Sequence, residues 1–541
     1  MRRWNGWGDD TIPYPLPANA FAFLEELVGP GAPARDATLA ATLAAIPVSR
    51  LPAHPLVRVE RLERLRHARG QSLPDWVALR GGLIPAFPDG VAFPTTADDV
   101  AALLTYAAET GARVIPYGGG TSVVGHINPA PGERPVLTIN MRRLNQLTRL
   151  DTTNQLATFG AGVAGPELEA QLRARGYTLG HFPQSFEYST LGGWVATRSS
   201  GQQSLRYGRI EGLFAGGVLL SPAGALHLPS FPASAAGPDL RQLILGSEGR
   251  MGILTEVTVR VTPLPEHEEF HALFFPDFAS GLSATRQIVQ ERLPLSLLRL
   301  STPTETRTTL ALAGHERLIG MLETLLSVRG VGGEKCMLLA GFTGRSTVVR
   351  DTRHTVMDIC HAGGGVSAGR RFGEQWIEGR FRTPYLRNTL WEAGYAVDTL
   401  ETATNWDNVP RMVEVIEAAL RPGLAEEGER VHVFTHLSHV YPQGASVYTT
   451  YLFRRAADPE ATLRRWETLK GAASRAIVAC GGTISHQHGV GRDHTPYLGA
   501  EKGALGLDAL AAAIARFDPH GIMNPGVLLG DETEESSRKE R

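Results

Sequence analysis

Two histidines, His486 and His488, stand one residue apart in a glycine-rich stretch near the C-terminal end, residues 481–491. In an extended backbone such a pair would point to the same face, and the flanking glycines would let a ligand approach closely. The pair could transfer a proton near neutral pH, bind a metal, or form hydrogen bonds within a loop. No carboxylate or cysteine stands beside them at ligand spacing, which favours proton transfer over metal binding.

Three further histidines and a tyrosine lie upstream of this pair. His432, His436 and His439 fall in one short stretch. Their spacing is not diagnostic, and a metal site shared with the downstream pair stays open. Tyr448 lies in a predicted strand, residues 444–451. Its phenol could relay a proton or hold a substrate oxygen, or it could be an ordinary strand tyrosine.

Two arginines are placed where a charge needs a partner. Arg299 is the lone charge in the apolar run 297–300, and a charged group is seldom buried unpaired. Arg387 stands at the start of a predicted helix. Its guanidinium could bind a phosphate with two N–H groups or form a surface salt bridge.

The central glycine motif is Pro-Tyr-Gly-Gly-Gly-Thr-Ser at residues 116–122, which follows the apolar run 112–115. Consecutive glycines allow a tight turn and close approach to a ligand, and successive backbone N–H groups in such a turn converge on an anion. The hydroxyls of Thr121 and Ser122 add donors. The loop could cradle a diphosphate, or it could be a glycine-rich surface turn.

Two more segments rich in glycine and hydroxyl groups follow, residues 184–201 and 246–256. In this order, the three segments resemble the flavin-binding fold of the vanillyl-alcohol-oxidase type, and the resemblance covers nearly the whole chain. In that family the first loop holds the FAD diphosphate, the middle segment runs along the isoalloxazine ring, and the last packs near the adenosine end. No histidine or cysteine lies within residues 118–122, so we expect FAD to be bound non-covalently. His126 is the only nearby candidate for attachment.

The resemblance implies a set of cofactor-binding residues from all three segments. These are Pro116, Tyr117, Gly118, Gly119, Gly120, Thr121, Ser122, Gln184, Ser185, Ser189, Thr190, Gly193, Thr197, Arg198, Ser199, Ser200, Glu248, Gly249, Gly252 and Ile253.

Within this fold, the chain is most similar to the alkyl-dihydroxyacetone-phosphate synthase family. Tyr448 falls on that family's active-site tyrosine, and Arg299 and Arg387 match arginines that the family uses, Arg387 for the substrate phosphate. His486 and His488 fall on the first and third of three consecutive family histidines. The middle position is Gln487, a departure, because glutamine cannot act as a base near neutral pH.

The resemblance implies a reaction. The family exchanges the acyl group of acyl-dihydroxyacetone phosphate for a fatty alcohol, an ether-lipid step in which FAD acts covalently without net electron transfer. The resemblance also implies catalytic roles for Tyr448, His486, His488 and Arg299, and a substrate-binding role for Arg387. Gln487 strengthens an alternative, an FAD-dependent dehydrogenase or oxidase of a 2-hydroxy acid.

The composition limits the partners and the compartment. A net charge of −2 gives no basic field for nucleic acid. Three distant cysteines suit a reducing compartment, and there is neither a long apolar run nor a signal peptide core. We expect a cytoplasmic homodimer with a lipid-like small-molecule substrate; peripheral membrane contact stays open.

The chain has 541 residues, too many for one hydrophobic core, so several domains are expected. We predict an α+β protein: a helical N-terminal segment at 1–85, a two-subdomain FAD-binding domain at 86–265, an α/β cap domain at 266–479, and a partly helical C-terminal segment at 480–541 that contributes to the active site. No G-x-G-x-x-G motif joins a strand to a helix, so a Rossmann unit is not supported. Predicted helices include 19–27, 57–68, 100–109, 316–328 and 409–420, and predicted strands include 136–140, 156–160, 213–220, 253–261, 336–342 and 446–453.

Overall fold

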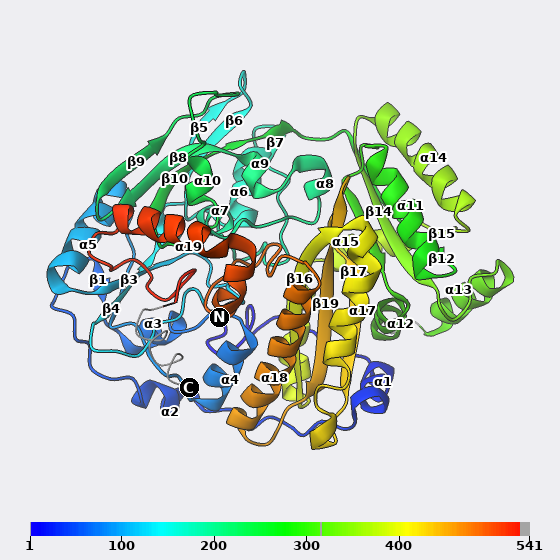
Figure 1. The fold of residues 1–541 in the computed structure, drawn as a ribbon, viewed down its shortest axis with the longest axis horizontal. Coiled ribbons are helices and arrows are strands. Elements are labelled where there is room, and N and C mark those ends of the chain that lie inside the picture. The colour runs from blue at the N-terminus through cyan, green and yellow to red at the C-terminus, as the bar shows by residue number, and fades with distance from the viewer. Residues whose placement is uncertain (1, 314–315, 531–541) are drawn as a thin grey trace.

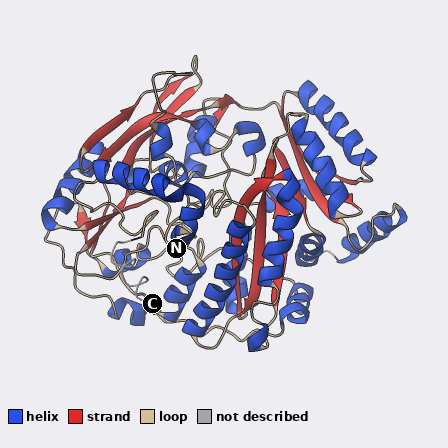
Figure 2. Ribbon diagram, viewed as in Figure 1, coloured by secondary structure: helices blue, strands red, loops and turns tan. Residues whose placement is uncertain are grey.

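Three large sheets organise the protein, whose computed structural model describes residues 2–313 and 316–530 (Figure 1). A four-stranded sheet has the order β1-β2-β4-β3, and a five-stranded sheet has the order β5-β6-β10-β8-β9. The third sheet has the order β15-β12-β14-β13-β17-β19-β16, with β18 paired to β19. The first two sheets lie in the left half of the view and the third in the right half (Figure 2). This arrangement confirms the predicted α+β, two-subdomain fold with a cap.

The four-stranded sheet carries the glycine loop. Its strands are β1 (Val57–Arg58), β2 (Gly90–Ala92), β3 (Arg113–Tyr117) and β4 (Val136–Asn140), of which β2, β4 and β3 run parallel. Helix α5 (Ala97–Thr110) begins at a capping box between Thr96 and Asp99 and ends at Gly111 with φ +67°. This helix directs the chain into β3, which delivers residues 116–122 to the sheet edge.

One prediction in this region is wrong. The expected helix 57–68 begins as strand β1, and helix α3 covers only Arg61–Arg66. Pairing of β1 with β2 outweighs the helical periodicity there. Arg64, expected on a solvated face, is buried and donates to the carbonyls of Pro88 at 2.6 Å and Pro47 at 2.7 Å.

The five-stranded sheet is antiparallel and carries the other two glycine segments. Its strands are β5 (Leu147–Asp151), β6 (Leu156–Gly160), β8 (Phe214–Ser221), β9 (Gly224–Leu228) and β10 (Ile253–Arg260), with helices α6 (Gly165–Arg173), α7 (Leu191–Thr197), α9 (Ile210–Leu213) and α10 (Arg241–Ile244) beside it. Phe159 and Phe214 are fully buried in its core. The sheet therefore provides a rigid base for the segments around residues 190 and 250.

The third sheet forms the cap, and its neighbouring strands are antiparallel. They are β12 (His267–Phe275), β13 (Leu297–Ser301), β14 (Cys336–Gly344), β15 (Val366–Gly369), β16 (Tyr395–Asn405), β17 (Val431–Leu437), β18 (Val440–Tyr441) and β19 (Gly444–Arg454). The associated helices are α11 (Phe278–Gln290), α12 (Pro303–Ala313), α13 (Glu316–Val328), α14 (Ser346–Ala362), α15 (Arg370–Gly379), α17 (Val409–Leu420) and α18 (Pro459–Ala479). The bounds of α13 and α17 are those predicted, and the triple glycine 363–365 ends α14 as a helix stop.

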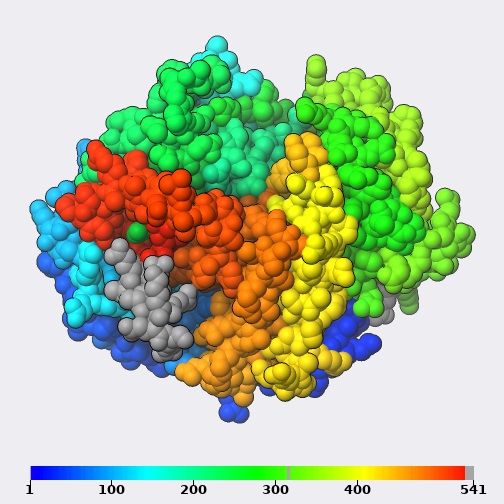
Figure 3. All heavy atoms as spheres, viewed as in Figure 1, coloured from blue at the N-terminus to red at the C-terminus, as the bar shows by residue number. Residues whose placement is uncertain are grey.

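The C-terminal segment returns to the first half of the molecule. Helix α19 (Leu498–Phe517), red in Figure 3, lies over the five-stranded sheet, and the backbone N–H of Ala223 donates to Phe517 at 3.2 Å. Val114 of β3 exchanges hydrogen bonds with Ile522 and Asn524 at 2.7 and 2.8 Å. The segment 480–497 that precedes α19 is thereby held between the two halves.

Seven α-helices and strands of the described residues remain besides the short 3₁₀ turns. They are α1 (Ala18–Val28), α2 (Leu39–Ala44), α4 (Leu73–Gly81), α8 (Ser204–Tyr207), α16 (Leu386–Glu392), β7 (Tyr177–Thr178) and β11 (Thr262–Pro263). None of the helices in the described part of the chain combines the length and apolar character needed to cross a bilayer.

Phe453 tests the packing of the cap sheet. Its side chain is 0% exposed in β19, between Ala396 and Val431 of the adjacent strands. Phe453→Ala should lower the free energy of unfolding by about 3–5 kcal/mol, because it removes buried area and leaves a cavity. Denaturant titration of the variant against Leu505→Ala, whose side chain is 82% exposed, measures the effect. Equal unfolding midpoints for both variants would show that this core assignment is wrong.

Candidate active site

Strand register places a row of polar side chains on one face of the cap sheet. Tyr448 of β19 stands directly opposite Glu401 of β16 and opposite His436 of β17. His436 in turn stands opposite Ser301 of β13, and Arg299, two residues earlier, shares that face. The row Arg299–His436–Tyr448–Glu401 therefore crosses four strands.

The Arg299 end of the row is an ion-pair cluster. The Arg299 guanidinium contacts the carboxylate of Glu305 from α12 and lies 3.2 Å from His436 Nδ1, which is 2.9 Å from the same carboxylate. Burial opposes ionisation of Glu305, but His436 and Arg299 hold its pKa below the ordinary value. The charge of Arg299 thus has the partner that its apolar strand required.

Tyr448 stands inside the row, and His488 approaches it from the segment 480–497. The Tyr448 ring stacks on His436 with centroids 4.8 Å apart, and it meets His488 edge-on at 6.1 Å. Burial raises the pKa of the Tyr448 phenol and lowers the pKa of the His488 imidazole. A phenol that stays protonated therefore lies beside an imidazole that stays neutral, which is a suitable pair for moving one proton.

His486 has different partners, because the backbone bends at residues 486–488 instead of running extended. Its Nδ1 lies 3.1 Å from the Glu401 carboxylate, and its Nε2 lies 2.7 Å from Arg209 and 2.6 Å from the Tyr441 hydroxyl. A guanidinium can only donate, so Nε2 accepts and Nδ1 carries the proton toward Glu401. Burial lowers the pKa of His486 to about 4. Arg209 and Tyr441 occupy Nε2, while Nδ1 faces Glu401 at 3.1 Å without hydrogen-bond geometry, so a direct role in proton transfer stays a prediction.

A metal could be held by one group of described residues, judged by distance alone. One ligand atom each from Glu401, His439 and His486 lies within 4.8 Å of the others. The proton on His486 Nδ1 opposes this, since a metal needs the lone pair of that nitrogen. His432 lies elsewhere, with its Nε2 2.9 Å from the Thr308 hydroxyl.

Arg387 comes from α16 and lies outside the row. One terminal nitrogen donates to the Gln71 carbonyl at 2.6 Å, and the guanidinium lies 4.6 Å from the Trp76 ring centroid. Its other terminal nitrogen, Nη2, is buried without a hydrogen-bond partner among the described residues. Burial lowers the pKa of Arg387 below its ordinary value, and the opposing effects of Asp398 and Tyr448 do not reverse this shift. Such an orphaned donor is suited to an anionic ligand.

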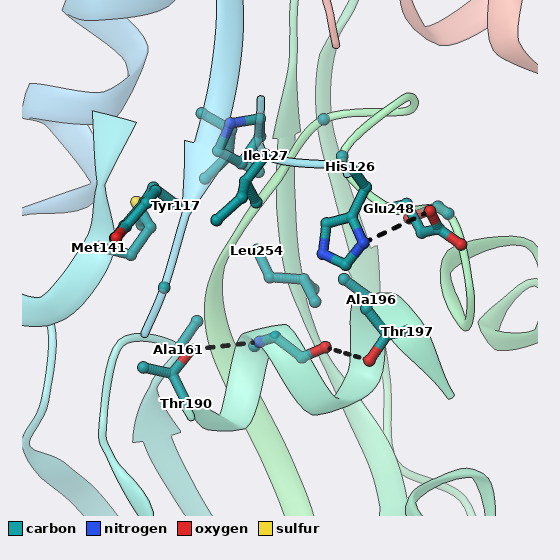
Figure 4. A pocket seen from close by; sticks show the side chains of 18 of the residues that line it. Tyr117, His126, Ile127, Met141, Ala161, Thr190, Ala196, Thr197, Glu248 and Leu254 are labelled. Atoms are coloured by element: carbon teal, nitrogen blue, oxygen red, sulfur yellow. Dashed lines mark hydrogen bonds and ion pairs between the residues drawn. The ribbon is translucent and has the colours of Figure 1, made fainter. Parts of the chain in front are cut away.

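A cavity lies between the first two sheets (Figure 4). Ten of the predicted residues line it: Pro116, Tyr117, Gly118, Thr190, Gly193, Thr197, Glu248, Gly249, Gly252 and Ile253. His126, Ile127, Met141, Ala161, Gly192, Ala196, Leu219, Ser247 and Leu254 complete the wall. A largely apolar wall with a few polar groups and bare glycine backbone fits a flat aromatic cofactor and its diphosphate.

The other ten predicted residues do not line the cavity: Gly119, Gly120, Thr121, Ser122, Gln184, Ser185, Ser189, Arg198, Ser199 and Ser200. Several of their side chains bind protein groups. Ser189 accepts from the Trp194 indole at 2.8 Å, Ser199 lies 3.2 Å from His181 Nε2, and Arg198 donates to Gln242 at 3.0 Å. Their contact with the cofactor stays a prediction.

The glycine loop packs tightly against the middle segment. A Cβ at Gly119 would lie 1.9 Å from the Tyr188 carbonyl oxygen, and one at Gly118 would lie 2.2 Å from Thr190 Oγ1. Only glycine permits this approach, because real Cβ atoms are not found at such distances. The packing brings residues 116–118 and 190–197 to the same cavity wall.

His126 and Glu248 face each other on the cavity wall, with His126 Nδ1 3.8 Å from the carboxylate and 3.1 Å from Ser122 Oγ (Figure 4). Glu248 also accepts from the backbone of Val490 and, at 2.7 Å, of Gly491. Burial raises the pKa of Glu248 to about 7, although these two N–H groups oppose the shift. Glu248 thus fastens the histidine segment to the cofactor domain.

Sequence reasoning missed Glu401, Arg209, Tyr441 and Glu305. Each is a common residue type in an unremarkable stretch, and strand register alone places Glu401 opposite Tyr448. His439 was noticed only as a metal candidate. For a residue of this polar row, the only signal in the sequence was a single charge within an apolar strand, and that signal pointed to Arg299.

Two family models match the chain. Residues 88–227 match the FAD binding domain, and residues 264–528 match the C-terminal domain of FAD linked oxidases.

Named relatives agree with these models. The alkyldihydroxyacetonephosphate synthase of Dictyostelium discoideum is 30% identical over 99% of this chain and 95% of its own length. A solved structure of an alkyldihydroxyacetonephosphate synthase superposes with a TM-score of 0.82 at 28% identity, covering 97% of this chain and 98% of that one. The 4-ethylphenol oxidase from Gulosibacter chungangensis, at TM-score 0.66 and 12% identity over 93% of this chain and 99% of that one, shares the fold.

Gly119 tests the assignment of the cavity. Gly119→Ala should lose most of the bound FAD, because the added methyl group would meet the Tyr188 carbonyl and displace the loop. Absorbance of the purified protein gives FAD per chain. Gly212→Ala is the matched control, since a Cβ there meets nothing within 4 Å. Full flavin content in both variants would refute the assignment.

Proposed function

The chain belongs to the alkyldihydroxyacetonephosphate synthase family, and we propose that it exchanges the acyl chain of acyl-dihydroxyacetone phosphate for a fatty alcohol, using non-covalent FAD. The observation that carries this proposal is the Tyr448–His488 pair, whose tyrosine lies in one polar row with Arg299, together with the buried Arg387 guanidinium, whose Nη2 has no partner among the described residues. A donor for a phosphate and a pair suited to proton transfer are both needed for a phosphorylated ketone substrate.

Arg387 would bind the substrate phosphate. Its Nη2 is buried and lacks a protein acceptor among the described residues, and its Nη1 is fixed by the Gln71 carbonyl. Stacking on Trp76 holds the guanidinium plane. A phosphate oxygen at Nη2 would supply the missing acceptor and offset the charge.

Tyr448 and His488 would manage the substrate proton. Bound FAD would supply the reactive centre for the exchange, with no net electron transfer. His488 is held neutral by burial and can accept a proton from the substrate carbon, while the Tyr448 phenol can donate to a substrate oxygen. The Arg299–Glu305–His436 cluster positions Tyr448 from its other face.

One alternative has an observation in its favour. Gln487 replaces a family histidine, and His439 and His486 lie with Glu401 as a possible metal-binding group, as flavin-dependent 2-hydroxy acid dehydrogenases would use. In that case Arg387 would bind a carboxylate and electrons would leave through an acceptor.

We also propose an oligomeric state and a location for the enzyme. It acts as a cytoplasmic homodimer on a lipid-like substrate and contacts a membrane surface peripherally to obtain it. Light scattering of the purified holoenzyme and sedimentation with vesicles test these two properties.

The assay that tests the reaction uses acyl-dihydroxyacetone phosphate and a labelled long-chain alcohol with no electron acceptor. Labelled ether product and free fatty acid should appear together. A panel of 2-hydroxy acids with an artificial acceptor runs in parallel. Steady reduction of the acceptor, without label in an ether product, would overturn the synthase proposal in favour of the alternative.

Tyr448→Phe isolates the phenol. The change keeps the ring that stacks on His436 but removes the proton donor, so FAD content should be normal and turnover should fall by about 10²–10⁴-fold. Tyr177→Phe, in the short strand β7, is the matched control. Near-normal turnover of Tyr448→Phe would make the tyrosine a packing residue.

A further inference from the structure

The buried carboxylate of Glu401 is the common partner of residues from several parts of the chain. It is 3% exposed. Ser438 Oγ donates to it at 2.6 Å, the Gln487 amide donates to its other oxygen, and His486 Nδ1 and His439 Nδ1 lie 3.1 and 3.4 Å away. Two imidazoles and one amide therefore surround a single carboxylate.

Gln487 occupies the position at which the family resemblance requires a histidine. Its amide nitrogen reaches Glu401, so a histidine there would present its ring to the same carboxylate. The amide keeps the hydrogen bond, but it cannot take up a proton. Compared with a family member that has a histidine at position 487, Glu401 would have one imidazole fewer beside it unless another residue supplied that ring.

We propose that His439, from the connection between β17 and β18, supplies the imidazole that Gln487 does not, so that the working unit is Glu401–His439–His486. The proposal rests on the proposed function. His439 is a positioning residue in this scheme, since it acts on the reacting groups through Glu401.

The placement of His439 supports this substitution. Its ring is buried and lies 4.9 Å from the His486 ring at an angle of 38°. Its Nε2 is 3.1 Å from the carbonyl of Gly201, the end of the segment predicted to run along the flavin. One ring thus joins Glu401 of the cap to the backbone of the cofactor domain.

The effect reaches Tyr448 through the sheet. Glu401 stands directly opposite Tyr448 in the β16–β19 ladder. It also fixes His486 and Gln487, which lie in the same backbone bend as His488. Burial opposes ionisation of Glu401, but His486 and His439 hold its pKa well below the ordinary value. A carbonyl can only accept, so His439 Nε2 donates to Gly201, while His439 Nδ1 lies 3.0 Å from the Ser438 hydroxyl that donates to Glu401. Loss of the His439 ring would remove this support from Ser438 and Glu401 and would loosen residues 486–488.

A metal shared by Glu401, His439 and His486 is the competing explanation. Arg209, at 2.7 Å from His486 Nε2, keeps the proton on Nδ1, where a metal would have to bind. Metal analysis of the purified holoenzyme belongs in the test. A stoichiometric metal that is lost in His439→Gln would overturn the proposal.

The test moves the histidine from one position to the other. His439→Gln should lower kcat of the exchange by about 100-fold with little change in KM, because a small misplacement of the catalytic groups by a change away from the chemistry costs about that much. The double variant His439→Gln/Gln487→His should recover to within about tenfold of the parent, because it returns an imidazole to Glu401. If His439 only filled space in the fold, the histidine introduced at position 487 of the double variant would not restore kcat.

The melting temperature gives a readout that needs no substrate. If both positions share Glu401, the double variant should melt closer to the parent than His439→Gln does. Absence of exchange in the parent would overturn the proposed function, while the melting comparison would still decide the inference. His354→Gln, on an exposed face of α14, controls for loss of any histidine.

Two results contradict the inference. One is normal kcat in His439→Gln; the other is a double variant that binds FAD fully yet recovers neither kcat nor melting temperature. If the double variant does not fold, Gln487→His alone decides between the explanations. An unchanged kcat is expected, since His439 already fills the role, whereas a marked rise in kcat would mean that the missing imidazole had not been replaced.

Discussion

A carboxylate buried away from water must be matched by donors or cations, and this requirement organises the site around Glu401. The donors come from the β17–β18 connection and from residues 486–487, and Arg209 of the cofactor domain secures His486 from its other side. None of these segments is close to another in sequence. The need to compensate one charge therefore brings together both halves of the molecule.

A second buried carboxylate completes the arrangement. Glu248, on the cofactor side, accepts from the backbone of Val490 and Gly491, while Glu401, on the cap side, binds Gln487. The short segment that carries His488 is held at both ends, each end by a different half of the protein. This explains how His488 can be fixed beside Tyr448, although its ring forms no hydrogen bond to a strand within residues 2–313 and 316–530.

The sequence predicted what depends on local pattern. Short apolar runs predicted β4 and β6 with their observed bounds, and apolar periodicity predicted residues 100–109 of α5, which the capping box at Thr96 extends to Ala97–Thr110. Residues of the glycine-rich segments do line the cavity between the first two sheets, because close approach leaves a local signature; that FAD occupies this cavity stays a prediction. Resemblance pointed to Tyr448 and His488. Glu401, Arg209 and the role of His439 depend on strand register and on contacts between distant segments, which no local pattern encodes. The strand β1 was mistaken for helix for the same reason, since its partner β2 lies far along the chain.

The central claim is that chemistry at Tyr448 and His488 consumes no electrons, and counting turnovers per flavin under anaerobic conditions tests it most directly. Holoenzyme is mixed with excess acyl-dihydroxyacetone phosphate and fatty alcohol in the absence of oxygen and of any acceptor. The account predicts many ether products per FAD, with the product still accumulating linearly after the first turnover. Product formation that stops at one equivalent per FAD, and resumes only when an acceptor is added, would contradict it.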